Sequence, residues 1–210
     1  NLNLEFYCLY SLRHAQYLSN VSYQKHNALD AVLSSMLDKE TIEDSLRFKV
    51  HQFWGNIYVK HNYHILALNE YLFSQNIAYV MRDDSKIVEN LIGLLQVYDI
   101  LKDDNSFMET QALIESYMPE EDTDLQIRYY LKLRSLESRF SRAESESYLR
   151  KVLELSSKSR KFDFPIKKEL TIFYLDHFKI DSALATIEYL EKKYLKEKPL
   201  KHLHAKIHIE

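Results

Sequence analysis

Glycine, proline and cysteine are scarce in this chain. It holds 2 Gly, 3 Pro and 1 Cys among 210 residues. Loops that cradle phosphate, and folds rich in tight turns, need residues that tolerate positive φ. With Gly55 and Gly93 alone, neither the GxGxxG nor the P-loop nucleotide-binding motif can be written. A lone Cys8 also excludes an internal disulfide and a zinc site built from several cysteines.

Long hydrophobic runs are missing as well. Hydrophobic residues make up 46% of the chain but are dispersed, so no membrane span is expected in this segment. The first ten residues have neither a basic region nor a small-residue cleavage site, which argues against a signal peptide. A single cysteine fits a reducing compartment but does not decide between a cytoplasmic location, which it slightly favours, and a periplasmic sensor region. The chain opens and stops inside apolar patterns, and we therefore expect it to be a piece of a longer protein.

Charge is distributed unevenly along the chain. Residues 1–124 hold 9 Lys and Arg against 19 Asp and Glu, a net charge of −10, and residues 125–210 hold 19 against 12, a net charge of +7. Such a dipole steers a charged partner, or else reflects solvated faces of an elongated protein. The basic residues of the second half are interrupted by Glu and the total charge is −3, so no nucleic acid partner is expected.

Apolar residues recur at steps of three and four almost throughout, which is the helical period. Short polar breaks separate about ten predicted helices of roughly 13 to 20 residues. Connections this short make neighbouring helices antiparallel. Two breaks have the spacing of a capping box or its Asp variant: Thr41 with Asp44, and Ser141 with Glu144. The fold class is therefore predicted to be all-α.

A repeat is visible within this helical pattern. Residues 48–81 and 164–197 share a register in which Tyr58 precedes Ala67 by 9 residues and Tyr174 precedes Ala183 by 9. The matching positions are His51, Trp54, Gly55, Tyr58, Ala67, Tyr71 and Tyr79 in the first segment, and Lys167, Leu170, Thr171, Tyr174, Ala183, Ile187 and Leu195 in the second. The anchors Tyr58, Tyr98, Leu136 and Tyr174 follow one another at 40, 38 and 38 residues. This pattern resembles the tetratricopeptide repeat.

The resemblance implies an α-solenoid of about five antiparallel helix hairpins with a right-handed superhelical twist. One repeat domain would span residues 1–210, with hairpins at 1–40, 41–82, 84–118, 122–160 and 164–197 and the start of a further helix at 199–210. In such a stack Gly55 and Ala67 would lie where two helices cross closely. Residues expected in the packing core are Trp54, Gly55, Tyr58, Ala67, Tyr71, Tyr98, Tyr174, Ala183 and Ile187.

The resemblance also implies a binding surface. The first helix of each hairpin would line a concave groove that receives a protein segment or peptide. The groove-facing candidates are Gln52, Asn56, Lys60, Gln96, Arg134 and Lys168. The alternative for each is an ordinary solvated helix face. The acidic first half favours a partner segment that carries Lys or Arg.

Similar degenerate repeats occur in sensor regions of bacterial histidine kinases, diguanylate cyclases and peptide-controlled transcription regulators. We therefore expect a non-enzymatic protein- or peptide-binding module, the sensor or regulatory region of a larger bacterial signalling protein. The alternative is a structural assembly scaffold that acts mainly through homo-oligomerisation, for example as a homodimer.

Residue patterns typical of metal sites or catalytic sites give only weak signals in this sequence. His61 and His64, and likewise His204 and His208, have spacings seen in metal sites, but HExxH is absent and packing or surface roles are more common, so no metal and no cofactor is expected. Cys8 stands among Phe6, Tyr7, Leu9 and Tyr10 and is interpreted as a small buried hydrophobic residue. No catalytic residues are predicted and the chain is not expected to be an enzyme. A site assembled across distant helices is the alternative.

Overall fold

A computed structural model describes residues 3, 5–6, 8–12, 27–37, 42–136, 139–156 and 162–194. These residues form helices and short connections and contain no strand, which confirms the all-α prediction for this part of the chain. The chain divides into two compact units, Asn1–Tyr117 and Met118–Glu210. Within the same residues, no helix is both long and apolar enough to cross a membrane.

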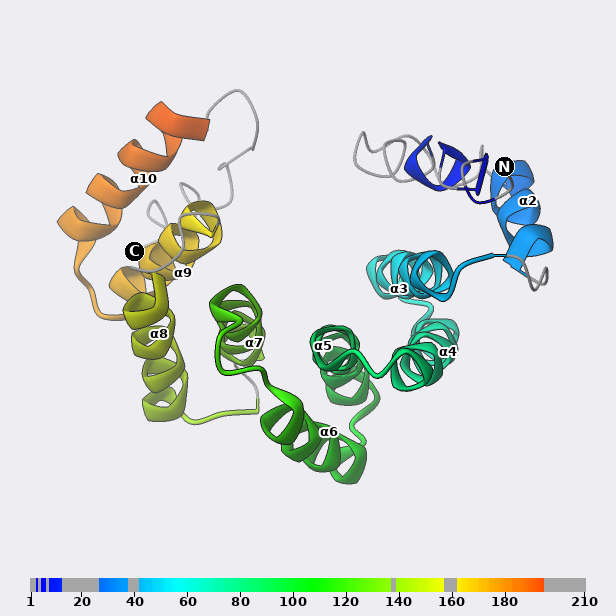
Figure 1. Ribbon diagram of the computed structural model, residues 1–210. Helices are drawn as coiled ribbons and strands as arrows, with labels where there is room; N and C mark the ends of the chain where they lie inside the picture. Colours follow the sequence, from blue (N-terminus) through cyan, green and yellow to red (C-terminus); the bar gives the residue numbers. More distant parts are fainter. Residues whose placement is uncertain are drawn as a thin grey trace. The chain divides into compact units, whose positions relative to one another are not determined.

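Unit 1 contains α2 (Asn27–Leu37), α3 (Asp44–Lys60), α4 (His64–Met81), α5 (Asp84–Leu101) and α6 (Asp104–Tyr117). α3 packs on α4, α4 on α5 and α5 on α6, with a smaller contact between α3 and α5 (Figure 1). Each helix thus packs chiefly on its neighbours in the chain, and α4 lies against both α3 and α5. The predicted segments 41–82 and 84–118 each contain two of these helices.

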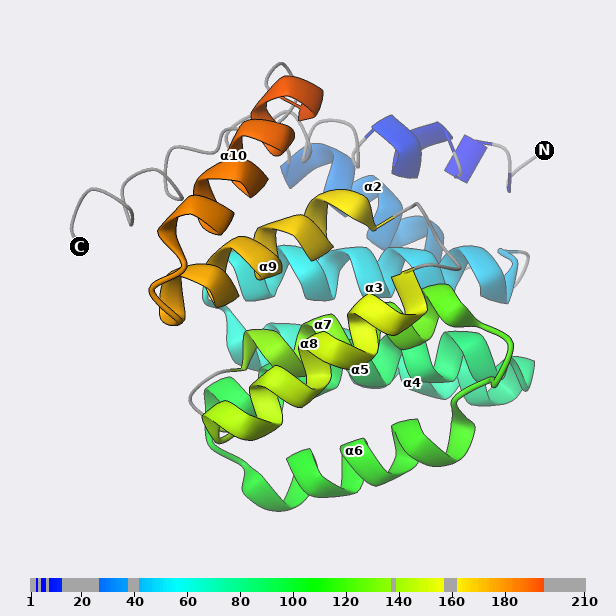
Figure 2. The same cartoon turned by 90° about the vertical axis from the view of Figure 1, so that its left-hand side faces the viewer.

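Unit 2 contains α7 (Thr123–Ser135), α8 (Arg142–Ser156), α9 (Asp163–Asp176) and α10 (Ile180–Tyr194). α7 packs on α8, and α9 on α10, with weaker contacts of α9 with α8 and α7 (Figure 2). The predicted segment 122–160 contains α7 and α8, and 164–197 begins one residue inside α9. The predicted helix at 199–210 lies outside the described residues. The single domain over 1–210 and its superhelical twist stay predictions.

Acidic side chains cap the N-termini of several helices. Three aspartates accept a hydrogen bond from the backbone N–H three residues later, at 3.0–3.1 Å: Asp83 before α5, Asp103 before α6 and Asp122 before α7. Before α8 the backbone N–H of Ser141 donates to Glu144 at 2.8 Å, and that of Glu144 donates to the Ser141 hydroxyl at 3.3 Å. This reciprocal pair confirms the predicted capping box. Thr41 lies outside the described residues.

Several helices end on a residue in the left-handed region without using glycine. Positive φ occurs at Asn62 (63°), Arg82 (53°), Lys102 (58°) and Phe178 (54°), and at neither glycine. This conformation crowds the Cβ atom of any residue except glycine. Both glycines lie inside helices, so other residues adopt the left-handed conformation at these helix C-termini.

Both glycines face one tyrosine ring. A Cβ atom on Gly55 of α3 would lie 2.8 Å from Cε1 of Tyr71, and one on Gly93 of α5 would lie 2.6 Å from the same atom. Tyr71 on α4 is 2% exposed. The ring therefore fills the junction of α3, α4 and α5, and glycine is required on both sides because a methyl group would overlap the ring.

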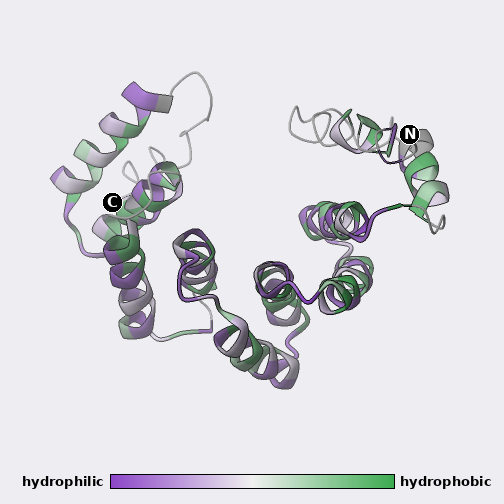
Figure 3. Cartoon of the chain, viewed as in Figure 1, coloured by the Kyte–Doolittle hydropathy of each residue, from purple (hydrophilic) through white to green (hydrophobic). Residues whose placement is uncertain are grey.

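The predicted core is confirmed in part. Of the nine residues, these six are buried: Trp54, Gly55, Ala67, Tyr71, Ala183 and Ile187. The anchors Tyr58, Tyr98 and Tyr174 are less fully enclosed, since each is partly buried. A tyrosine commonly buries its ring while its hydroxyl reaches water. Figure 3 shows hydrophobic and hydrophilic residues mixed along the helices.

The interpretation of Cys8 as a buried residue is wrong, because its side chain is exposed. Phe6 is fully buried, and Leu9 and Tyr10 pack against the core cluster that contains it. Residues two apart on a helix point in widely different directions. An apolar sequence around Cys8 therefore did not place Cys8 itself in the core.

Candidate binding sites

A pocket of about 500 Å³ opens between α3 and α5 in unit 1. Its lining comes from the N-terminal helical segment, α3 and α5, and consists of Tyr10, Phe48, Lys49, Gln52, Phe53, Asn56, Lys86 and Glu89. Phe48 and Phe53 are only 2% and 4% exposed and form an apolar base. The other α3 side chains at this pocket, Lys49, Gln52 and Asn56, follow at steps of three and four and so share one helix face.

Asn56 is held in one orientation at this pocket. Its Nδ2 donates to the backbone carbonyl of Gln52 at 2.8 Å, and its Oδ1 accepts the hydroxyl hydrogen of Tyr71 at 3.0 Å. A primary amide has two N–H donors and two acceptor lone pairs. The exposed Asn56 amide therefore keeps donor and acceptor capacity for a further group.

A buried amide fixes Tyr71 from its other side. Asn90 of α5 is fully buried, and its Nδ2 donates to the Tyr71 carbonyl at 2.8 Å and to Oε1 of Gln75 at 2.7 Å. These bonds join α5 to α4, while the Tyr71 hydroxyl joins α4 to Asn56 on α3. The pocket side chain Asn56 thus rests on a hydrogen-bonded network across three helices.

The charges at the pocket do not follow the acidity of residues 1–124. Lys49 and Lys86 contribute two positive charges to the lining and Glu89 one negative charge. Lys86 also pairs with Asp83. Its side-chain hydrogen bond lowers the pKa of Asp83 against the opposing effect of burial. The lining alone therefore carries one net positive charge, which Asp83 beside it offsets.

The structure brings together only some of the predicted groove residues. Gln52 and Asn56 line the α3–α5 pocket. Lys60 is exposed at the last turn of α3, and Gln96 is partly buried on α5, and neither lines that pocket. Lys168 is partly buried on α9, with Nζ 4.0 Å from Oε1 of Glu169. Arg134 belongs to a separate pocket in unit 2.

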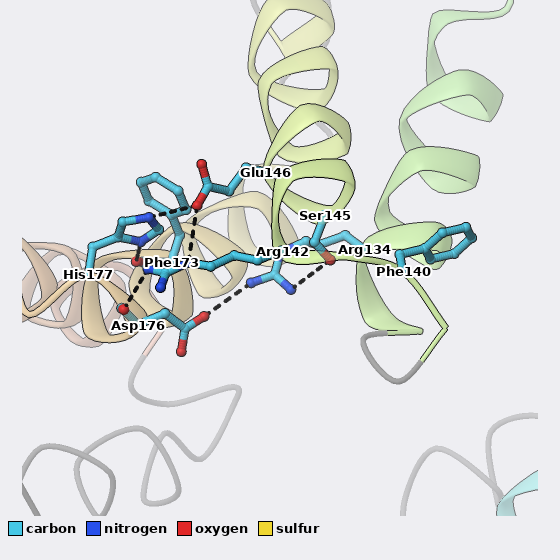
Figure 4. A pocket seen from close by; sticks show the side chains of 8 residues that line it. All are labelled: Arg134, Phe140, Arg142, Ser145, Glu146, Phe173, Asp176 and His177. Carbon is cyan, nitrogen blue, oxygen red and sulfur yellow. Dashed lines mark hydrogen bonds and ion pairs between the residues drawn. The ribbon is translucent and has the colours of Figure 1, made fainter.

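The pocket in unit 2 has a volume of about 200 Å³ and lies among α7, α8 and α9 (Figure 4). It is lined by Arg134, Phe140, Arg142, Ser145, Glu146, Phe173, Asp176 and His177. Arg134 is only 4% exposed. Its Nη1 donates to the Ser145 hydroxyl at 3.5 Å and its Nη2 to Oδ2 of Asp176 at 3.4 Å. A permanently charged guanidinium thus lies buried at this pocket.

His177 is bonded through both ring nitrogens. Nδ1 lies 2.7 Å from the Phe173 carbonyl oxygen, and Nε2 lies 2.7 Å from Oε1 of Glu146. Desolvation raises the pKa of Glu146, but hydrogen bonds and charges from His177 and Arg142 outweigh it and lower the pKa overall. The imidazole ring of His177 therefore connects the end of α9 to Glu146 on α8.

Sequence reasoning missed most of the residues around these two pockets. Lys49 stands three residues before Gln52, so helix periodicity alone would have placed it on the same face. Lys86 and Glu89 are likewise three residues apart and share one face of α5. Glu146 and His177 are 31 residues apart. No local pattern joins them.

The histidine pairs offer no metal site in the part of the chain that the structure describes. There His61 is exposed, His64 is partly buried, and no group of three or more His, Cys, Asp or Glu side chains is placed to hold a metal ion. His202, His204 and His208 lie outside this part. Comparison of the chain with protein-family models, curated proteins and solved structures gave no match.

Proposed function

We propose that this chain is a non-enzymatic protein- or peptide-binding module whose recognition surface is the α3–α5 pocket. The observation that carries the proposal is the composition of that pocket. Two buried phenylalanines form its base, and amide and charged side chains surround them. Sites that bind peptides commonly combine an apolar recess with a few oriented polar groups.

The pocket suits a short segment with one apolar side chain. That side chain packs on Phe48 and Phe53, while the amides of Gln52 and Asn56 bond to the backbone of the segment. Lys49 and Lys86 favour an acidic residue next to the apolar one. The attraction of a basic partner by the acidic first half stays a prediction, and its contacts would lie outside this pocket.

The proposal includes the wider architecture. Packing of α3 to α6 and of α7 to α10 on their chain neighbours supports a tetratricopeptide-like α-solenoid, and the resemblance implies that it has a right-handed twist. The resemblance of the repeats supports a role as the sensor or regulatory region of a larger bacterial signalling protein. The full-length gene product tests this role: a kinase, cyclase or DNA-binding region in the same polypeptide is expected.

Two matched double variants test the binding surface. Lys49→Ala with Gln52→Ala removes a lysine and a glutamine from the pocket, and Lys60→Ala with Gln96→Ala removes the same residue types outside it. Binding is measured by selection from a displayed peptide library, followed by titration of the selected peptide. We expect the pocket variant to bind at least about tenfold more weakly and the control variant to match the parent.

Circular dichroism and melting curves establish that both variants are folded. Unchanged binding by a folded pocket variant would contradict the proposal. So would an equal loss in the control variant, since the peptide would then contact another part of α3 and α5.

A second candidate function, a homo-oligomerising scaffold, is favoured by the exposed apolar face of α4. Ile65 is 60% exposed, Phe73 58% and Val80 73%, whereas Ala67, Tyr71 and Ala78 on the same helix are buried. The exposed residues follow one another at seven or eight positions and so form a stripe along the helix. Exposed apolar stripes are typical of sites where proteins associate.

The oligomeric state in solution tests this candidate. Light scattering coupled to size-exclusion chromatography is applied to the parent, to Ile65→Glu with Val80→Glu, and to Met108→Glu as a control at an exposed apolar residue of α6. A scaffold that pairs through α4 gives a dimer that only the double variant dissociates. A parent that is monomeric at high concentration rules this candidate out.

A further inference from the structure

We propose that the pocket in unit 2 is a separate site for a small monocarboxylate with a compact, flat apolar body. Its carboxylate would pair with the guanidinium of Arg134 in place of the side chain of Asp176. The proposal does not depend on peptide binding by unit 1. It rests on the burial of Arg134, on the exposure of its carboxylate partner, and on the charge and size of the pocket.

Arg134 is built to recognise a carboxylate. Its side chain is 5% exposed, so packing restricts its movement. A guanidinium stays charged at any physiological pH and presents parallel N–H donors that match the two oxygens of a carboxylate. The buried hydroxyl of Ser145 lies 3.5 Å from Nη1 and supplies a neutral group beside the fork.

Asp176 is a partner that a ligand can replace. Its side chain is 49% exposed, and its Oδ2 lies 3.4 Å from Nη2 of Arg134, longer than the 2.7–2.9 Å usual for a charge-assisted hydrogen bond. Asp176 is also the last residue of α9, where the helix dipole disfavours negative charge. A ligand carboxylate that approaches closer would leave Asp176 free to turn into water.

The charges of the pocket favour a singly charged anion. The lining has two guanidinium groups, Arg134 on α7 and Arg142 on α8. It has two negative groups, Glu146 and Asp176. Glu146 is already bonded to both Arg142 and His177, at 3.3 Å and 2.7 Å. Once Asp176 turns into water, the one positive charge of Arg134 is left for the ligand, which favours a monocarboxylate over a polyanion.

The size and walls of the pocket limit the rest of the ligand. A volume of about 200 Å³ lies below the roughly 300–1,000 Å³ of sites for drug-sized molecules. The rings of Phe173 and His177 lie side by side with centroids 4.1 Å apart (Figure 4). Beside such a wall a flat, compact body such as a phenyl ring makes close contact.

Titration of the 210-residue chain with three probes tests the site. Benzoate is the ligand, benzamide is its neutral isostere, and inorganic phosphate tests a different anion, with binding followed by calorimetry and by ¹H–¹⁵N spectra. We expect saturable benzoate binding, with benzamide and phosphate at least about tenfold weaker, because only benzoate pairs a planar charge with the fork of Arg134. Benzamide or phosphate binding as tightly as benzoate overturns the proposal, as does the absence of benzoate binding.

Two aspartate variants on α9 make the test independent of a folding defect. Asp176→Asn removes the competing carboxylate without changing its shape, and we expect benzoate to bind about three- to tenfold more tightly. Asp163→Asn is the control, since Asp163 is also on α9, pairs with Lys193 at 2.9 Å and lies outside this pocket. Unchanged benzoate affinity in folded Asp176→Asn, or an equal gain in Asp163→Asn, contradicts the proposed exchange of carboxylates.

Discussion

Asn56 in unit 1 and Arg134 in unit 2 stand at the same position of the predicted repeat, two residues before the anchors Tyr58 and Leu136. Their surroundings differ. Asn56 is exposed and accepts the hydroxyl hydrogen of Tyr71, whereas Arg134 is buried and contacts Ser145 and Asp176. One register position thus gives an exposed amide in one unit and a buried cation in the other.

The second helix of each pair explains the difference. Tyr71 on α4 and Leu149 on α8 are equivalent, because they follow Ala67 and Ser145 by four residues. The ring of Tyr71 extends across the junction between two glycines, and its hydroxyl reaches Asn56. Leu149 is equally buried but shorter and has no polar group, so it offers the first helix no hydrogen bond. The residue on the second helix therefore decides what the first helix can present.

The largest effect is expected from filling the space beside Tyr71. Alanine normally stabilises a helix over glycine by about 1 kcal/mol. At Gly55 or Gly93, however, the new methyl group would meet the Tyr71 ring at 2.8 or 2.6 Å. We expect Gly55→Ala and Gly93→Ala each to lower the free energy of unfolding by about 1–3 kcal/mol in urea denaturation.

A change at the ring itself provides the control for that prediction. In a Tyr71→Leu background the ring is absent, so Gly93→Ala is expected to be neutral or stabilising. If Gly93→Ala costs the same in both backgrounds, the close approach of Gly93 to Tyr71 is not the reason for the glycine.

Buried alanines compare the tightness of helix packing in the two units. Ala67 on α4 and Ala183 on α10 are both fully buried. Replacing either with leucine is expected to lower the free energy of unfolding by about 1–3 kcal/mol, because three carbon atoms must enter a packed helix crossing. Ala112→Leu and Ala185→Leu, at exposed positions of α6 and α10, serve as controls. Equal melting temperatures for the buried and exposed variants would show that the assumed repeat register is wrong.

Local patterns in the sequence predicted the features that are determined within a single helix or one helix pair. The apolar period gave the helices, the pair Ser141 and Glu144 gave a cap, and the repeat slots placed Gly55, Ala67 and Tyr71 in the core. Gly93 was not assigned to that core, because it meets Tyr71 on the preceding helix and falls in no slot of the repeat.

The candidate sites were less predictable for the same reason. Gln52 and Asn56 share a helix face, and periodicity alone places them together. Arg134 is hydrogen-bonded to Ser145, 11 residues away, and to Asp176, 42 residues away. Contacts of this kind are set by how helices pack, and a single sequence holds no local signal for them.

A smaller, stabilising effect is expected where helices end in the left-handed conformation. Lys102 after α5 and Phe178 after α9 have φ of 58° and 54°. Glycine adopts this conformation without crowding, so Lys102→Gly and Phe178→Gly are each expected to raise the free energy of unfolding by about 1 kcal/mol. Lys102→Ala is the control, because alanine keeps a Cβ atom. A gain of equal size in Lys102→Ala would mean that the lysine side chain, and not the backbone, is the source of strain.

The smallest effect concerns the acidic helix caps, which both units use. Hydrogen bonds from Ser106 lower the pKa of Asp103 below about 3.8 in unit 1, and hydrogen bonds from Ser141 lower that of Glu144 below about 4.5 in unit 2. A carboxyl whose pKa is lowered on folding stabilises the protein above its unfolded pKa, and this contribution is lost as pH falls through the folded value.

We therefore expect the melting temperature of the parent to decrease below about pH 4.5. The melting temperature of Asp103→Asn should decrease less steeply, since asparagine still caps a helix but does not titrate there. Glu144→Gln should flatten the curve in the same way, beginning at a slightly higher pH. Melting curves recorded between pH 3 and pH 7 measure both slopes. Parallel curves for parent and variants would show that the caps contribute nothing to acid sensitivity.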